Sequence, residues 1–357
     1  MTTIASSALL ELLEIELPIL QAPMAGVSTP ELAAAVASAG ALGAVALGAS
    51  SAANAHAQIA DFRVRSTGPL HANVFCHRRA RRDLQRETAW LERLRPEFAR
   101  LGSAPPAALS ELYPSFVDDD AMLAMLVAAR PKVVSFHFGV PSDERVRALR
   151  QAGILLLGSA TRVEEARLLA SAGVHAVIAQ GYEAGGHRGV FDPDADDDQL
   201  GTLALTRLLV RALDIPVIAA GGIMDGAGIA AALCLGASAV QLGTAFIDCP
   251  ESRADAGYRA ALRSEAAQHT VMTRAISGRP ARCLRNRFTA LGRDLAARDI
   301  PDYPVAYDAG KALHAAGTQA AEFGFGAQWA GQGAPLARAL PAAELVMTLA
   351  RELSRCS

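Results

Sequence analysis

The 357-residue sequence lacks any run of about 18 uninterrupted apolar residues, so it predicts no membrane-spanning helix. It also lacks a charge excess, because Lys plus Arg (34) nearly balances Asp plus Glu (36). No global field therefore attracts nucleic acid or an anionic membrane. Aromatic residues are scarce at 5%, whereas hydrophobic residues make up 51% of the chain. These numbers indicate a large alanine-rich core and a small-molecule partner.

The cysteines are few and predict neither a disulfide framework nor a metal site. The five of them are odd in number, irregularly spaced and without a CxxC pair, which argues against disulfides and against a zinc site. The first 18 residues contain three glutamates and no basic region, unlike a secretory signal. We therefore expect a cytoplasmic protein without a metal ion.

Short apolar runs alternate with alanine-rich helical segments, which is the rhythm of repeated βα units. The expected strands cover residues 18–24, 41–47, 70–75, 133–138, 154–158, 176–180, 217–220 and 239–243. Eight such strands predict an α/β fold, the (β/α)8 TIM barrel, with its active site at the carboxyl ends of the strands. We expect the barrel to span residues 1–246 and 341–357. Residues 247–340 would form a small helical subdomain, inserted after the eighth strand, that completes the substrate pocket.

Two other connections, 77–117 and 182–199, are longer than simple crossovers and are candidate lids or binding elements. The first contains a basic cluster at residues 78–82 and the second an acidic run at residues 194–198. We expect both charged runs to be solvated loop faces.

The stretch 176–190 organises the rest of the chain. A buried strand closed by Gln180 leads into a turn with four glycines and a single histidine, His187. Glycines let the backbone bend sharply or approach a ligand closely. Loops that follow barrel strands usually carry the chemistry, so we place catalysis at His187. An ordinary connector remains the alternative interpretation.

Two further glycine turns predict a phosphate site. Gly221 and Gly222 follow the seventh expected strand, and residues 241–244 (Gln241, Leu242, Gly243 and Thr244) end the eighth. In this fold, the loops after strands seven and eight commonly bind phosphate through backbone amides. Close helix packing is the alternative role for these glycines.

The ends of the first and third expected strands face the same rim. Ala22, Pro23 and Met24 offer backbone donors and an apolar wall, as an isoalloxazine ring requires. Asn73 and Gln180 carry amides that suit its pyrimidine edge. Each amide alone is more often a strand cap, so the prediction depends on their convergence.

The segments PILQAPMAG, AGGHRG, IAAGGI, AVQLGTAF and QWAGQGAPLAR together resemble the flavin-dependent nitronate monooxygenases, specifically the bacterial class with the WAGQG segment. The resemblance covers residues 18–338. It implies an FMN-bound barrel that oxidises alkyl nitronates with molecular oxygen to the carbonyl compound and nitrite or nitrate. The resemblance also implies that the reaction needs no metal and no reduced nicotinamide. The family's FMN contacts match Asn73, Gln180, Gly222, residues 241–244, and the glycines Gly185 and Gly186 beside the active-site histidine, His187. An imidazole can take the proton α to a nitro group or hydrogen-bond a nitronate oxygen.

The substrate pocket is expected to contain Tyr303, Tyr307 and Lys311, whose i, i+4, i+8 spacing would place them on one helix face. His137, in the fourth expected strand, is assigned to the same pocket. The resemblance implies propionate 3-nitronate, which carries a carboxylate, as the favoured substrate, with oxygen as the second partner and a homodimer as a candidate assembly. A solvated helix face is the alternative for the 303–311 series.

Two other functions stay open at this level. An FMN-dependent enoyl-acyl carrier protein reductase shares the barrel and glycine motifs but consumes reduced nicotinamide. A catalytically silent flavin- or phosphate-binding protein would need no ionisable group such as His187, since fold does not fix function.

Overall fold

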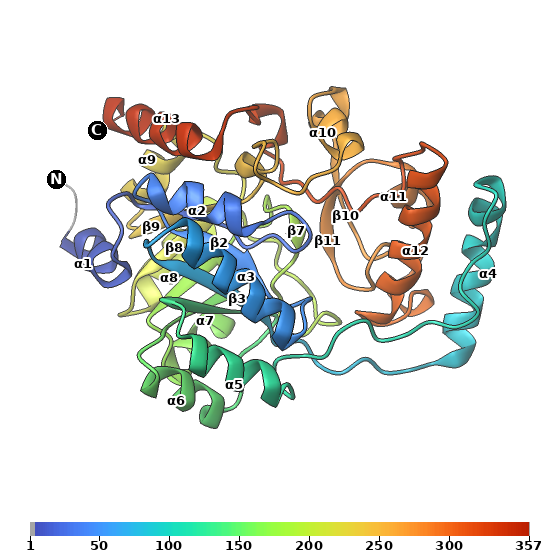
Figure 1. Ribbon diagram of the computed structural model, residues 1–357, viewed down its shortest axis with the longest axis horizontal. Coiled ribbons are helices and arrows are strands. Elements are labelled where there is room, and N and C mark those ends of the chain that lie inside the picture. The colour runs from blue at the N-terminus through green and yellow to red at the C-terminus, as the bar shows by residue number, and fades with distance from the viewer. Residues whose placement is uncertain (1–3, 357) are drawn as a thin grey trace.

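The computed structural model describes residues 4–356 and contains the predicted barrel (Figure 1). Eight parallel strands pair in the order β1-β9-β8-β6-β5-β4-β3-β2. They are β1 (Ile19–Gln21), β2 (Gly43–Ala46), β3 (Leu70–Phe75), β4 (Val133–His137), β5 (Leu155–Ala160), β6 (Ala176–Gln180), β8 (Val217–Ala220) and β9 (Ala239–Leu242).

The sheet closes between β1 and β2. A parallel bridge joins Leu20 to Leu42, and the amide of Leu42 donates to the carbonyl of Ile19 at 3.0 Å. The prediction of a TIM barrel is therefore confirmed. Strand β1 is shorter than expected, because residues 22–24 bend away from the barrel wall to line the cavity described below.

The barrel is surrounded by helices whose ends follow ordinary capping chemistry (Figure 1). Thr29 Oγ1 accepts a hydrogen bond from the amide of Leu32, and Asp225 accepts one from the amide of Gly228. The helices are α1 (Ile4–Leu13), α2 (Pro30–Ser38), α3 (Ala52–Arg65), α5 (Asp120–Ala129), α6 (Asp143–Gln151), α7 (Val163–Ala172), α8 (Thr202–Ala212), α9 (Gly226–Cys234) and α13 (Ala342–Arg355). Within the described residues, no helix combines the length and apolar character that crossing a membrane requires.

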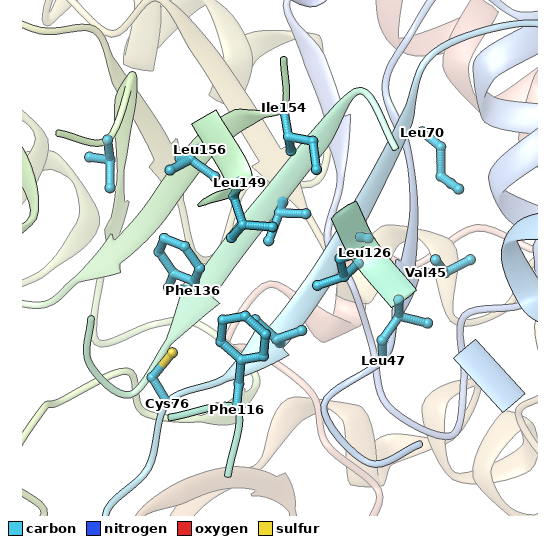
Figure 2. Packing of buried hydrophobic residues seen from close by; sticks show 14 of the residues in the cluster. Val45, Leu47, Leu70, Cys76, Phe116, Leu126, Phe136, Leu149, Ile154 and Leu156 are labelled. Atoms are coloured by element: carbon cyan, nitrogen blue, oxygen red, sulfur yellow. The ribbon is translucent and has the colours of Figure 1, made fainter. Parts of the chain in front are cut away.

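A large core cluster fills the space between the strands and the helices outside them. Figure 2 shows Phe136 and Leu156 on the strands near Leu126 of α5 and Leu149 of α6, all fully buried. Phe116 stacks on Phe136 with ring centroids 6.2 Å apart. Each such side chain contributes about 1.5–3 kcal/mol on burial, so this cluster fixes the barrel that carries the site.

The insertion after β9 is mixed, which corrects the expectation of a purely helical subdomain. It contains α10 (Ala256–Leu262), α11 (Arg287–Leu291) and α12 (Val305–Gln319), but also β10 (Thr270–Thr273) and β11 (Ala281–Leu284). Strand β11 pairs with the short strand β7 (Gly186–His187), which belongs to the glycine-rich turn after β6. The insertion is thus tied to the barrel through the turn that holds His187.

The connection after β3 packs against the insertion as well, and the two together are called the second layer of the molecule. Its helix α4 (Leu84–Arg100) lies beside α12 at the edge of the molecule (Figure 1). Trp90, Leu94 and Phe98 are buried in one cluster with Leu313 of α12. The 77–117 connection therefore supports the insertion.

Candidate active site

One cavity at the carboxyl ends of the barrel strands brings together every residue that the sequence assigned to the site. Its lining includes Ala22, Pro23, Met24, Asn73, His137, Gln180, Gly185, Gly186, His187, Gly221, Gly222, Gln241, Leu242, Gly243, Thr244, Tyr303, Tyr307 and Lys311. These residues come from six barrel strands or the turns after them and from the insertion. Convergence of this kind around one cavity is what a ligand site requires.

The turn after β8 is shaped by backbone conformations that only glycine adopts freely. Gly221 has φ +125° and Gly222 has φ +70°. Thr202, the first residue of α8, donates its hydroxyl hydrogen bond to the carbonyl of Gly221 at 2.9 Å, and its amide donates to Glu183 at 2.8 Å. The turns after β6 and β8 are thereby held together at the rim.

The WAGQG segment locks the second glycine turn. The amide of Gly331 donates to Thr244 Oγ1 at 3.0 Å, and the amide of Gln332 donates to the carbonyl of Glu183 at 2.9 Å. A Cβ at Gly185 would lie only 2.5 Å from the nitrogen of Gly331. The two motifs that are far apart in sequence therefore form one wall of the cavity.

Three amide side chains line the cavity, and they differ in their hydrogen-bond partners. The Asn73 amide donates to Ser135 Oγ at 2.8 Å. Gln180 uses both ends of its amide on the His187 turn: Nε2 donates to the carbonyl of His187 at 3.0 Å, and Oε1 accepts from the amide of Gly189 at 2.6 Å. Gln241 Oε1 is buried and has no hydrogen-bond partner within the described residues. Gln241 is thus the amide that a bound ring would satisfy.

His187 is held by both layers of the molecule. It pairs with Ala281 in the β7–β11 ladder, and its Nε2 lies 2.8 Å from Ser277 Oγ. Ser277 is fully buried and its hydroxyl also lies 3.2 Å from the carbonyl of Arg279. The Ser277 hydroxyl therefore links the His187 imidazole to the backbone of the insertion.

The surroundings of His187 keep its imidazole neutral. Burial, followed by the nearby His137, Arg279 and His77, lowers the pKa of His187 to about 3. His137 also lies against the backbone of this turn, with its Nε2 3.2 Å from the carbonyl of His187. At neutral pH the ring is therefore a hydrogen-bonding group and a weak base.

Aromatic rings surround this imidazole. Centroid distances from His187 are 5.1 Å to Trp329, 5.3 Å to Tyr303, 5.7 Å to Phe138 and 6.1 Å to Tyr307. Such walls exclude water and strengthen the electrostatic interactions inside. Trp329 lies within the WAGQG motif, but it was not among the site residues predicted from the sequence.

The Tyr303, Tyr307 and Lys311 series reaches the cavity by a different route from the one expected. Helix α12 begins at Val305, so Tyr303 precedes it and the three residues do not share one helix face. Lys311 Nζ lies 5.2 Å from the ring centre of Tyr307 and 5.3 Å from that of Tyr113. Lys311 is the one lysine or arginine among the cavity-lining residues in the described part of the chain.

Tyr113 and Ser277 were not predicted from the sequence as site residues. The Tyr303 hydroxyl lies 3.3 Å from that of Tyr113, which comes from the connection after β3. Neither residue belongs to a motif, and each reaches the site only through the tertiary packing of a long connection. No local sequence signal could have identified them.

The charged runs in the two long connections are not simply solvated, contrary to expectation. Arg78 lies 2.7 Å from Asp194, which joins the two connections directly. The buried Arg188, next to His187, forms a bidentate pair with Asp197 at 2.8 and 3.0 Å. The 190–199 segment therefore anchors the turn that carries the catalytic candidate.

Comparisons with known proteins agree with this geometry. A family model described as nitronate monooxygenase matches residues 6–352. The chain is 59% identical over 348 residues to a nitronate monooxygenase of Paraburkholderia phytofirmans, covering 98% of this chain and 95% of the relative. It is 54% identical over 342 residues to one of Pseudomonas aeruginosa, covering 96% and 97%.

Solved structures show the same fold. A nitroalkane oxidase from Streptomyces ansochromogenes superposes with a TM-score of 0.88 at 42% identity, covering 98% of each chain. FabK from Thermotoga maritima superposes with a TM-score of 0.73 at 29% identity, covering 98% of this chain and 96% of that one. The chain therefore belongs to the nitronate monooxygenase family, whose members are oxidoreductases.

Proposed function

We propose that the protein is an FMN-dependent enzyme that oxidises alkyl nitronates with molecular oxygen to the carbonyl compound and nitrite or nitrate, and that propionate 3-nitronate is its preferred substrate. Family membership supports an oxidoreductase. The residues that line the cavity support the cofactor and the substrate.

The cavity fits FMN. Its two glycine turns offer backbone amides for a phosphate, with Gly221 and Gly222 on one side and Gly243 and Thr244 on the other. Gln241, with its unpartnered buried Oε1, would accept a hydrogen bond from the ring. The remaining ring contacts would come from cavity-lining residues: Ala22, Pro23, Met24, Asn73, Gln180, Gly185, Gly186 and Leu242. When bound, FMN takes electrons from the substrate and passes them to oxygen.

The observation that carries the choice of substrate is the low basicity of His187. A general base works best when its pKa lies near the operating pH, and the pKa of His187 is lowered to about 3. This imidazole is poorly suited to deprotonate a neutral nitroalkane. A nitronate has already lost that proton, so it needs only to be bound and oriented beside the ring.

Lys311 supports a substrate with a second negative charge. Burial lowers the pKa of Lys311, and the nearby Asp308 opposes that shift. No carboxylate forms a salt bridge with Lys311 within the described residues, so its charge is available in the cavity. The neighbouring Tyr303 and Tyr307 hydroxyls stay protonated, because burial raises both pKa values. A carboxylate is the anion that such a set would bind.

An anaerobic mixing experiment tests this function. The purified protein should be yellow, and mixing it with propionate 3-nitronate without oxygen should bleach the visible flavin absorbance, which air should restore. A colourless protein that cannot be reconstituted with FMN would refute the cofactor assignment. Rapid oxidation of NADH, with no response to the nitronate, would favour the enoyl-acyl carrier protein reductase instead.

A further inference from the structure

A second cavity of about 430 Å³ lies where three long segments meet, next to the active site. The first segment is the 77–86 region after β3, the second is the 190–199 connection, and the third is the 274–303 part of the insertion. Tyr303 lines both this cavity and the active-site cavity. The volume falls within the roughly 300–1,000 Å³ range of small-molecule pockets.

The lining of this cavity is strongly cationic. Six arginines contribute to it: Arg78, Arg81, Arg86, Arg274, Arg279 and Arg298. Two carboxylates, Asp194 and Asp302, also line it, so six positive charges against two negative charges leave a formal excess of four. Two carboxylates outside the lining, Asp192 at 3.5 Å from Arg78 and Asp83 at 3.2 Å from Arg86, lower this excess to two.

The two aspartates are shared among arginines on one side of the cavity. Asp302 contacts Arg78 at 3.7 Å, Arg81 at 3.4 Å and Arg86 at 3.5 Å, and Asp194 lies 3.7 Å from Arg274. Arg279 and Arg298 have no carboxylate partner within the described residues. The carboxylates around the folded cavity therefore do not neutralise all of its arginines.

Arg279 gives independent evidence that a partner belongs here. It is 1% exposed and stacks over the ring of Phe138 at 4.1 Å, which fixes the plane of its guanidinium. One terminal nitrogen donates to the carbonyl of Val190, whereas its Nε is buried without any hydrogen-bond partner in the described residues. A buried N–H donor without an acceptor, and a buried positive charge without a carboxylate, both lower the stability of the fold unless a ligand or water interacts with them.

We propose that this cavity is a second binding site, distinct from the active site, for a small ligand that carries a diphosphate group. Guanidinium groups bind phosphoryl oxygens through paired N–H donors, and several arginines can share one group that has many oxygens. An excess of two to four charges calls for a ligand with at least two negative charges, and one carboxylate would leave at least one charge uncompensated. A bound diphosphate would also join the three segments that meet at the cavity.

Binding can be measured without turnover, so this inference succeeds or fails separately from the proposed activity. Protein saturated with FMN is titrated calorimetrically with inorganic pyrophosphate, inorganic phosphate and citrate, with sodium chloride at matched ionic strength. We expect saturable 1:1 binding that is tightest for pyrophosphate. At a concentration 100 times its Kd, pyrophosphate should raise the Tm by about 3 °C.

Matched variants locate the site. Arg298→Gln removes an exposed guanidinium that pairs with no carboxylate, and Arg274→Gln removes a half-buried one. Each should weaken pyrophosphate binding by about 10-fold or more. Arg351→Gln, an exposed arginine on α13 on the far side of the barrel, should change nothing.

Four outcomes would overturn the proposal. These are no saturable binding of any anion, an equal loss in Arg351→Gln, and release of FMN by pyrophosphate, which would place the anion in the turns after β8 and β9. The fourth is a tighter affinity for citrate than for pyrophosphate, which would exclude the phosphoryl class.

Discussion

Replacing His187 by asparagine should separate two roles that its imidazole can play. Asparagine can still hydrogen-bond but cannot accept a proton at neutral pH. A neutral nitroalkane must lose its α proton before it can be oxidised, whereas a preformed nitronate has already lost it. We expect kcat/KM to fall by about 10²-fold for the nitroalkane and by less than about 10-fold for the nitronate.

The expected size follows from the environment of the ring. A fall in pKa from 6.5 to about 3 weakens the affinity of the imidazole for a proton by about 5 kcal/mol. General bases usually contribute about 10² to 10⁴ in rate, and a base this weak belongs at the lower end of that range. The same shift predicts that wild-type kcat/KM for a preformed nitronate shows no imidazole ionisation between about pH 6 and 8.

The assay is oxygen consumption with each substrate form, measured before the two forms interconvert. His56→Asn, the same change at an exposed histidine on α3, serves as the control and should leave both rates unchanged. If the nitronate rate collapses together with the nitroalkane rate, His187 orients or stabilises the nitronate and the base assignment is wrong. An ionisation near pH 6.5 in the wild-type profile would refute the low pKa on which the substrate choice depends.

Three further substitutions test the walls of the site. Lys311→Met should raise KM for propionate 3-nitronate by about 10- to 100-fold while leaving that of an uncharged alkyl nitronate unchanged, because the contact is made with the carboxylate alone. Asp197→Asn should leave a buried guanidinium uncompensated and lower the free energy of unfolding by about 3 kcal/mol in urea, whereas the exposed Asp196→Asn should not. Gly185→Ala would place a Cβ 2.5 Å from the nitrogen of Gly331, so FMN should dissociate at least about 10-fold more readily in a flavin-release assay.

The barrel could be predicted from the sequence because each strand is a local signal. Apolar runs buried on both faces kept their bounds at β3, β6 and β8, where the predicted and observed residues coincide. The cavity lining was predictable for the same reason, since residues that end parallel strands must meet at one rim. Position in the barrel, rather than side-chain chemistry, placed Gln241 and Asn73 in the site.

The hydrogen-bond partners of those side chains could not be predicted. Gln180 and Asn73 carry the same amide chemistry as Gln241, yet the first two are bound to neighbouring backbone or hydroxyl groups and the third is not. Which amide remains free depends on partners contributed by other strands and turns. The helical spacing of Tyr303 and Tyr307 failed for a related reason: α12 starts at Val305, so periodicity alone placed the helix boundary too early.

The second layer of the molecule explains why the catalytic candidate depends on residues without a motif. His187 lies in a two-residue strand, and the sheet partner of this short strand is β11 in the insertion. The same insertion supplies Ser277, whose hydroxyl lies 2.8 Å from Nε2 of the imidazole, and Arg279, which helps to lower the pKa of the imidazole. The barrel therefore provides most of the cavity lining, whereas the 247–340 segment adds one hydrogen-bond partner of His187 and one of the charges that lower its pKa, after burial and the barrel residue His137. Exchange of that segment between family members should change the pH dependence of the reaction more than it changes FMN binding.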